Sequence, residues 1–157
     1  MIDQLFFYVL LPFVGTTAYV ALFHVPKQYY VSCGCTGVVS WTVSQLAAEH
    51  VSTGLAAFLA ALAAVFLSRM LTVRKKCPLT IFLAAGIIPL VPGTSVYYTI
   101  YYLVTNQLAL AAQRGLGAVK VAFGIVLGIV FVVAIPREVF QTHYWKLRRE
   151  QKGLKKD

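Results

Sequence analysis

Residues 86–102 read GIIPLVPGTSVYYTIYY and interrupt an apolar run that covers about residues 79–104. The run is long enough to cross a bilayer, which takes about 20 apolar residues. A proline, however, lacks the backbone N–H that would bond to the carbonyl four residues earlier. Pro89 and Pro92 therefore free two carbonyls near the middle of the run, just before Gly93. The pattern predicts a transmembrane helix that is broken at Pro89/Pro92-Gly93.

A second half-helix is expected to begin after Gly93, with Thr94 or Ser95 as its N-cap. Its first backbone N–H groups and its positive dipole end would then lie at membrane depth. Irregular backbone in hydrocarbon persists only where it is packed in protein or lines a wet cavity, and broken helices mark binding sites in transporters. Free N–H groups at Thr94–Tyr97 would suit a carboxylate. A structural kink satisfied by neighbouring helices is the other interpretation.

Composition indicates an integral membrane protein with little of the chain outside the bilayer. Of its 157 residues, 59% are hydrophobic and only 12% are charged, and the mean hydropathy is +0.76. A soluble domain is about a quarter charged. We therefore predict an all-α membrane protein with a five-helix transmembrane domain at residues 1–136 and a basic cytoplasmic tail at residues 137–157.

Five apolar segments are separated by short turns or polar connections. The first lacks the basic start and the cleavage site of a signal peptide, so we expect it to be retained as a helix. The fourth segment is the broken one, a polar connection is expected at Thr105–Gly115, and Pro136 ends the fifth segment. The other four are expected at about Leu5–Phe23, Tyr30–Ala48, Val51–Leu71 and Leu116–Ile135.

The net charge of +9 follows from topology rather than from nucleic-acid binding, because the basic residues flank apolar spans. With five spans, twelve basic residues fall on the side of the tail, and only Arg114 and Lys120 fall on the other. The positive-inside rule then places the N-terminus outside and the tail in the cytoplasm of a multi-pass cell-membrane protein. The basic tail either serves only as a topology anchor, which is the favoured interpretation, or also lies on anionic membrane lipid. No nucleic-acid partner is expected.

Small residues recur at helical spacing on three segments and would allow close helix packing in lipid. The packing partner is either another helix of the same chain or another subunit. The stripes comprise Gly34, Gly37, Ser40 and Ser44 in the second segment, Gly54, Ala57, Ala61 and Ala64 in the third, and Gly124 and Gly128 in the fifth.

Four tyrosines follow the break as two adjacent i, i+4 pairs: Tyr97, Tyr98, Tyr101 and Tyr102. Their hydroxyls would line a polar path, or their rings would form an aromatic belt at the membrane interface. Among these residues we include Tyr97 and Tyr98 in the candidate substrate-binding set. The rest of that set is Pro89, Pro92, Gly93, Thr94 and Ser95.

Glu49 and His50 are the only neighbouring acid and imidazole near a span. Ionisable groups within membranes mark proton paths, so these two are ion-coupling candidates, although solvated residues of an outer turn are the other interpretation. Trp41 and Gln45 are candidate cavity residues, and His24 is expected in a turn. The three cysteines have no nearby His or acid partners, so no metal or cofactor is expected.

Three motifs resemble the threonine/serine exporter family: Phe23-His24-Val25-Pro26, the Cys77-Pro78 turn, and the stretch from Ile87 to Tyr98 with its Pro-x-x-Pro-Gly-x-x-x-Tyr core. The resemblance is to the small component that corresponds to the C-terminal half of the exporter, and it extends over nearly the whole chain. It implies a ten-span exporter split into two chains, and therefore a larger membrane subunit as partner. It also implies efflux of threonine and serine, or of a dicarboxylate such as succinate.

The sequence thus predicts one subunit of a secondary efflux transporter for small solutes that carry a carboxylate, driven by an ion gradient and in particular by protons. No G-x-x-x-x-G-K-[ST] nucleotide-binding pattern is present. An enzyme is not expected, because no Asp lies inside any span and no catalytic groups converge. The alternative is a membrane scaffold or assembly subunit in which the break serves only packing.

Overall fold

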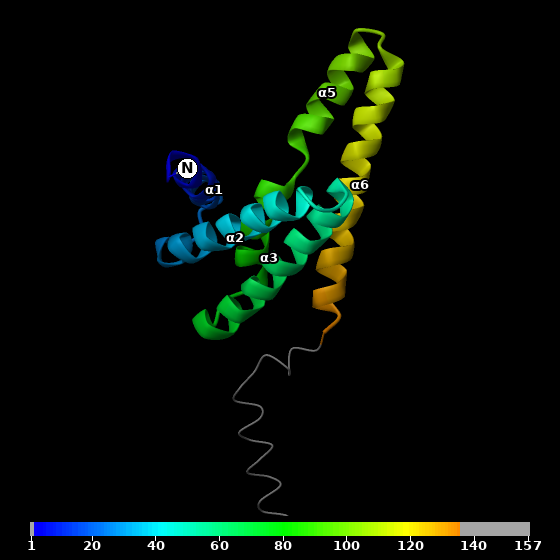
Figure 1. Cartoon of the computed structure of the whole chain (residues 1–157). Coiled ribbons are helices and arrows are strands. Elements are labelled where there is room, and N and C mark those ends of the chain that lie inside the picture. The colour runs from blue at the N-terminus through cyan, green and yellow to red at the C-terminus, as the bar shows by residue number, and fades with distance from the viewer. Residues whose placement is uncertain (1, 136–157) are drawn as a thin grey trace, which may run out of the picture.

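The computed structural model describes residues 2–135, with side chains from Tyr8 onward, and every regular element in this range is a helix (Figure 1). The predicted tail at residues 137–157 and the predicted stop at Pro136 lie outside the described residues. The elements are α1 (Ile2–Leu22), η1 (Lys27–Tyr29), α2 (Tyr30–Ala48), α3 (Thr53–Lys75), α4 (Leu79–Ile87), η2 (Ile88–Leu90), α5 (Gly93–Val104) and α6 (Leu108–Val133).

The predicted segments correspond to these helices, with one clear correction. The second segment coincides with α2, whereas the polar connection expected at Thr105–Gly115 is wrong. Only Thr105 to Gln107 form a turn, and α6 begins at Leu108. The reason is that Ala, Leu, Gln and Arg, which fill this stretch, are good helix formers whether or not they are polar.

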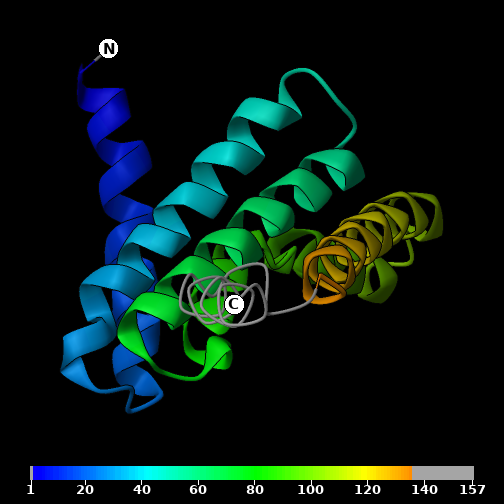
Figure 2. The same cartoon turned by 90° about the horizontal axis from the view of Figure 1, so that it is seen from below.

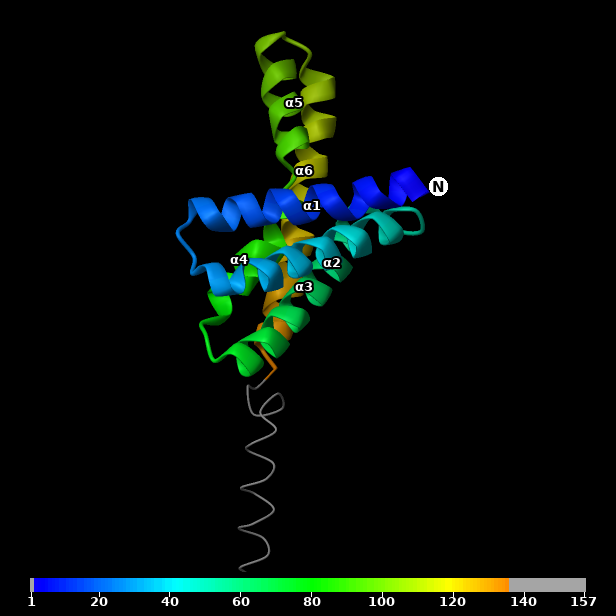
Figure 3. The same cartoon turned by 90° about the vertical axis from the view of Figure 1, so that its left-hand side faces the viewer.

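Two helices, α3 and α6, are long and apolar enough to cross a membrane, and the pair formed by α4–η2 and α5 makes a third if it counts as one bent span. The described part of α1 is apolar but shorter, over Tyr8–Leu22. Figures 1 and 3 show α1 and α2 crossing the direction of the α5–α6 hairpin rather than running alongside it. The prediction of five transmembrane helices is therefore not confirmed.

Helices α1, α2, α3 and α6 follow one another across the molecule (Figure 2), while α4 packs against both α2 and α3. Glycines allow the α3–α6 contact. A Cβ added at Gly124 would lie 2.3 Å from the Gly54 carbonyl oxygen, and one at Gly128 would lie 2.7 Å from Ala61 Cβ. These separations are too short for a side chain. The predicted small-residue stripes of the third and fifth segments thus pack against each other within the chain.

The contact between α1 and α2 is built in the same way. A Cβ added at Gly34 would lie 2.5 Å from the Phe13 ring, and one at Gly37 would lie 2.1 Å from Thr16 Oγ1. Both glycines belong to the small-residue stripe predicted for the second segment. The glycine face of α2 therefore packs closely against α1, as expected for helices in lipid, where no hydrophobic driving force brings them together.

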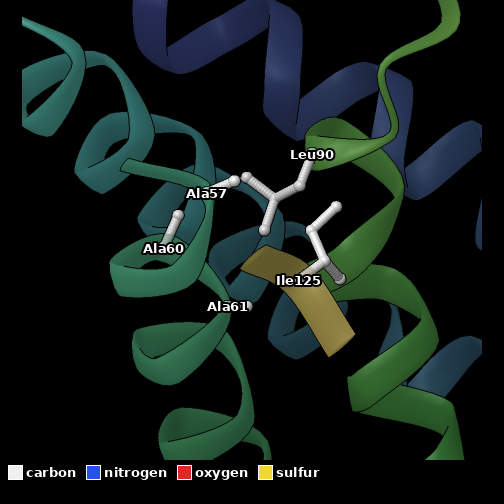
Figure 4. Close-up of a cluster of buried hydrophobic side chains, with 5 residues drawn as sticks. All are labelled: Ala57, Ala60, Ala61, Leu90 and Ile125. Atoms are coloured by element: carbon white, nitrogen blue, oxygen red, sulfur yellow. The ribbon is translucent and has the colours of Figure 1, made fainter. Parts of the chain in front are cut away.

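The 3₁₀ turn η2 packs in the core against α3 and α6. Leu90 packs with Ile125 of α6 and with three alanines of α3, Ala57, Ala60 and Ala61 (Figure 4). On another side of the bundle, Phe82 of α4 is fully buried and contacts the Tyr29 ring edge-on at 5.8 Å. The first half of the broken segment is therefore fixed by side chains of α2, α3 and α6.

The buried guanidinium of Arg69 ties α3 to the end of α6. It donates to the carbonyl oxygens of Ile135 and Val133, the latter at 2.8 Å. These carbonyls lie in the last turn and just beyond, where a helix leaves its acceptors unsatisfied. A cation at this end also complements the negative end of the helix dipole.

Helices α1, α3 and α5 are followed by non-glycine residues in the left-handed region: His24 (φ 55°), Lys76 (φ 50°) and Asn106 (φ 57°). After α1, the N–H of His24 bonds to Ala21 and that of Val25 bonds to Val20. This pair of bonds is the Schellman arrangement, which satisfies the last carbonyls of a helix. The expectation that His24 belongs to a turn is confirmed.

Candidate functional site

The predicted break of the fourth segment is present. Helix α4 ends at Ile87, η2 turns the chain over Ile88–Leu90, and α5 starts at Gly93 with a bend of 49° between the two halves. The turn is held by two backbone bonds, from Val91 N–H to the Ile88 carbonyl at 3.3 Å and from Gly93 N–H to the Val91 carbonyl at 2.8 Å.

The predicted cap of the second half-helix is wrong. The N-cap of α5 is Pro92, and no side chain caps this end by a hydrogen bond. The helix begins two or three residues earlier than expected because Gly93 adopts a helical conformation directly after the proline. The first backbone bond of the new helix runs from Val96 N–H to the Pro92 carbonyl at 3.1 Å. The N–H groups of Thr94 and Ser95 find no backbone acceptor within residues 2–135, as the first turn of a helix implies.

Gly93 itself is not required by the packing of this chain. A Cβ added there would meet nothing within 4 Å, and its φ is not in the left-handed region. Thr94 is exposed and Ser95 is half-buried. The start of α5 is therefore open at Gly93 and Thr94, and it carries free backbone N–H donors.

The tyrosines lie on the part of the break that has the fewest contacts. Tyr97 is 63% exposed, and no residue of α5 is buried. Tyr98 stacks on Tyr102 with ring centroids 6.1 Å apart, and the Arg114 guanidinium lies 5.7 Å above the Tyr98 ring. The second predicted pair, Tyr97 with Tyr101, shows no ring contact, since Tyr97 instead meets Tyr98 edge-on at 5.4 Å.

A cavity of about 390 Å³ lies beside the break, between α1, α2 and η2. Two of its wall residues were predicted: Pro89 belongs to the candidate substrate-binding set, and Trp41 is one of the two candidate cavity residues. Gln45 is half-buried but is not one of the lining residues. The complete lining comprises Tyr8, Leu11, Pro12, Gly15, Thr16, Trp41, Ile88 and Pro89.

The structure therefore divides the predicted substrate-binding set into two groups. Pro89 faces the cavity, whereas Thr94, Ser95, Tyr97 and Tyr98 lie on α5, which packs against α6 and is outside the cavity lining. The α1 wall was missed, because no binding residue was predicted in the first apolar segment. Pro12 and Gly15 were the available signal, since both residues favour a kink in a helix, but a kink does not reveal which neighbouring helix the segment faces.

Thr16 is the one lining residue with an unpaired buried side-chain hydroxyl. The residue is 1% exposed, and its Oγ1 has no hydrogen-bond partner among the described residues. It lies against the glycine surface of Gly37. An unsatisfied buried hydroxyl costs about 1–3 kcal/mol, so its presence calls for an explanation.

The ion-coupling candidates lie elsewhere. Glu49 and His50 are both exposed in the turn between α2 and α3, and neither lines the cavity. Within residues 2–135 no three His, Cys, Asp or Glu side chains gather as a metal site would require. The three cysteines are free thiols, and partial burial raises the pKa of Cys77 in the α3–α4 turn.

The chain matches the family model "Threonine/Serine exporter, ThrE" over residues 8–135. The match covers most of the chain, so the protein belongs to the threonine/serine exporter family. Comparisons with curated proteins and with solved structures found no match. The family is one of membrane transporters for amino-acid export, and the apolar helices agree with a membrane location.

Proposed function

We propose that this chain is the small subunit of a secondary exporter for small solutes that carry a carboxylate, and that the solute binds at the break between α4 and α5. One observation carries the proposal: the 49° break adjoins a cavity of about 390 Å³ whose wall includes Pro89. Ligand pockets are about 300–1,000 Å³. Irregular backbone and a pocket thus occur together, as in transporters with discontinuous helices.

The start of α5 supplies the carboxylate end of this site. The N–H groups of Thr94 and Ser95 are free within the described residues, and the positive end of the α5 dipole lies at the same point. A carboxylate at this position accepts both N–H groups. The family description favours threonine and serine as the solutes, and succinate is the dicarboxylate to test against them.

A larger membrane subunit completes the exporter in this proposal. Its support is the exposure of α5, which has no buried residue, and the extension of the α5–α6 hairpin past α1, α2 and α3 (Figures 1 and 3). In the complete assembly this subunit spans the membrane five times, with its N-terminus outside and its basic tail in the cytoplasm. Export is coupled to protons, with Glu49 and His50 as the ionisable pair to test.

The first experiment is efflux from cells preloaded with labelled threonine, serine or succinate, with the chain expressed alone and together with a candidate larger subunit. We expect efflux only when both chains are present. Efflux by the chain alone would contradict the subunit role. No efflux from either combination, despite correct insertion, would contradict the transport function and favour a scaffold.

Gly93→Leu tests the break as a site. A side chain at Gly93 meets nothing within 4 Å, so the subunit should fold and assemble while export is lost. Gly117→Leu is the matched control, since a side chain there also meets nothing within 4 Å. Loss of assembly by the Gly93 variant alone would favour the scaffold. For coupling, an unchanged pH dependence of efflux in Glu49→Gln would remove Glu49 from the mechanism.

A further inference from the structure

Several hydroxyl groups of the described helices bond to the backbone of their own helix, whereas the buried hydroxyl of Thr16 does not. Five of them donate to the backbone carbonyl four residues earlier at 2.6–2.9 Å, as Thr17 does to Phe13 at 2.7 Å. The others in this group are Thr36, Thr42, Ser68 and Thr99. For Thr16 the corresponding carbonyl belongs to Pro12, yet the hydroxyl makes no such bond and has no other partner among the described residues.

The position of the Thr16 hydroxyl offers it nothing to bond to. A Cβ at Gly37 would be 2.1 Å from Oγ1, so the hydroxyl is directed at a glycine methylene. The next staggered position about χ1 would move Oγ1 off Gly37. In the structure Oγ1 itself is buried against Gly37 and does not open into the cavity. Thr16 is nevertheless one of the residues that line the cavity, so an incoming group meets this hydroxyl only after the χ1 rotation.

The rest of the lining narrows the class of ligand. The eight lining residues include no Asp, Glu, Lys or Arg, so the cavity holds no charged partner for a second carboxylate, and burying that charge would be costly. Leu11, Pro12 and Pro89 offer apolar walls. A small apolar side chain with a single hydroxyl therefore fits the chemistry of this cavity, with its hydroxyl paired to Thr16.

We propose that Thr16 is a specificity-determining residue that selects the β-hydroxyl of a hydroxy-amino acid in the cavity between α1, α2 and η2. This inference rests on the proposed export function. A site with an unpaired buried hydroxyl discriminates against an analogue that cannot pair with it.

The test compares threonine with 2-aminobutyrate, which is threonine without its hydroxyl. Each unlabelled amino acid competes for efflux of labelled threonine from cells that express the full chain with its larger subunit. We expect threonine to compete about tenfold better or more, the factor that one buried unpaired hydroxyl produces. In Thr16→Val this preference should fall to within about twofold, with 2-aminobutyrate still exported. Thr16→Ser, which keeps the hydroxyl, should restore it.

Two matched controls separate selection from folding. Thr17→Val removes a hydroxyl that is already bonded to Phe13. Thr72→Val removes the other buried unpartnered hydroxyl among the described residues, which lies in α3 and lines no part of this cavity. Neither should change the preference for threonine. Thr16→Val and Thr72→Val should both raise the melting temperature, by roughly 2 °C, because an unsatisfied polar group is removed.

A wild-type preference that persists in Thr16→Val would overturn the proposal. So would a wild-type exporter that treats threonine and 2-aminobutyrate alike, although the proposed export function would then stand. No export of threonine by the wild-type assembly would overturn both together.

Discussion

Helices α4 and α5 are the two halves of one broken apolar segment, and their surroundings differ sharply. In α4 the Phe82 side chain is 0% exposed and packs among α2 and its neighbours, whereas in α5 the Tyr97 side chain is 63% exposed. The first half is held by the bundle, and the second is held by α6. The break at Pro89–Gly93 is therefore the boundary between a packed region and a hairpin with an open face, and this boundary is where we place the solute.

The largest effect on stability is expected from a substitution that disrupts the packed region, at the contact between α3 and α6. Gly124→Leu would place a side chain against the Gly54 carbonyl oxygen, which lies 2.3 Å from the modified Cβ position. We expect a loss of at least about 3 kcal/mol in stability, because backbone cannot yield as a side chain would. Gly117→Leu on the same helix should change stability little, since nothing lies within 4 Å. The measurement is thermal unfolding of the two variants in detergent. Equal losses of stability in both variants would show that α3–α6 packing does not depend on glycine.

Truncating one aromatic residue in each half sharpens the contrast. Phe82→Ala leaves a cavity in the core and should cost about 3 kcal/mol, while Tyr97→Ala on the exposed face of α5 should cost less than about 0.5 kcal/mol. The measurement is the melting temperature of each purified variant. A comparable loss for Tyr97→Ala would mean that α5 is packed as tightly as α4.

The two ends of α6 can likewise be compared for how strongly an arginine side chain stabilises each of them. Arg69→Gln removes the charged donors to the Val133 and Ile135 carbonyls and should cost about 2 kcal/mol. Arg114→Gln, near the hairpin end, loses only the contact above the Tyr98 ring and should cost about 0.5 kcal/mol. Protease sensitivity near the end of α6 should increase in the first variant and stay unchanged in the second.

The smallest expected effects concern the helix ends. His24→Gly relieves a left-handed conformation at the end of α1 and should add about 1 kcal/mol of stability. Asn106→Gly at the end of α5 should add less than about 0.5 kcal/mol, because Asn tolerates this conformation. Thermal unfolding measures both variants. A larger gain at Asn106 would indicate that the hairpin turn is more strained than its bonds suggest.

Local patterns in the sequence predicted much of the fold. The bounds of α2, the break at Pro89/Pro92-Gly93 and the glycine stripes could be found because proline chemistry and helical spacing act over a few residues. The N-cap of α5 could not be predicted in this way, because the cap depends on where the first helical turn closes. Pro92, rather than Thr94 or Ser95, is the N-cap. The polar stretch before Leu116 was misread because polarity alone does not end a helix.

The candidate site could be predicted only in part, for a physical reason. Pro89 and Trp41 were singled out, but the α1 wall with Thr16 joins them only through the tertiary contact of α1 with α2. The unpaired state of the Thr16 hydroxyl is a matter of rotamer and packing against Gly37. No pattern along the chain distinguishes Thr16 from Thr17, whose hydroxyl is bonded.

The length of α6 has a further consequence for how the protein sits in lipid. Its 26 residues span about 39 Å at about 1.5 Å each, against about 30 Å of hydrocarbon. The excess must be taken up by tilting or by projection into the headgroups, and each ångström of mismatch carries a small energy. Since α5 is packed on α6, a thinner bilayer that tilts α6 would carry α5 with it. Bilayer thickness would then set the angle at the break.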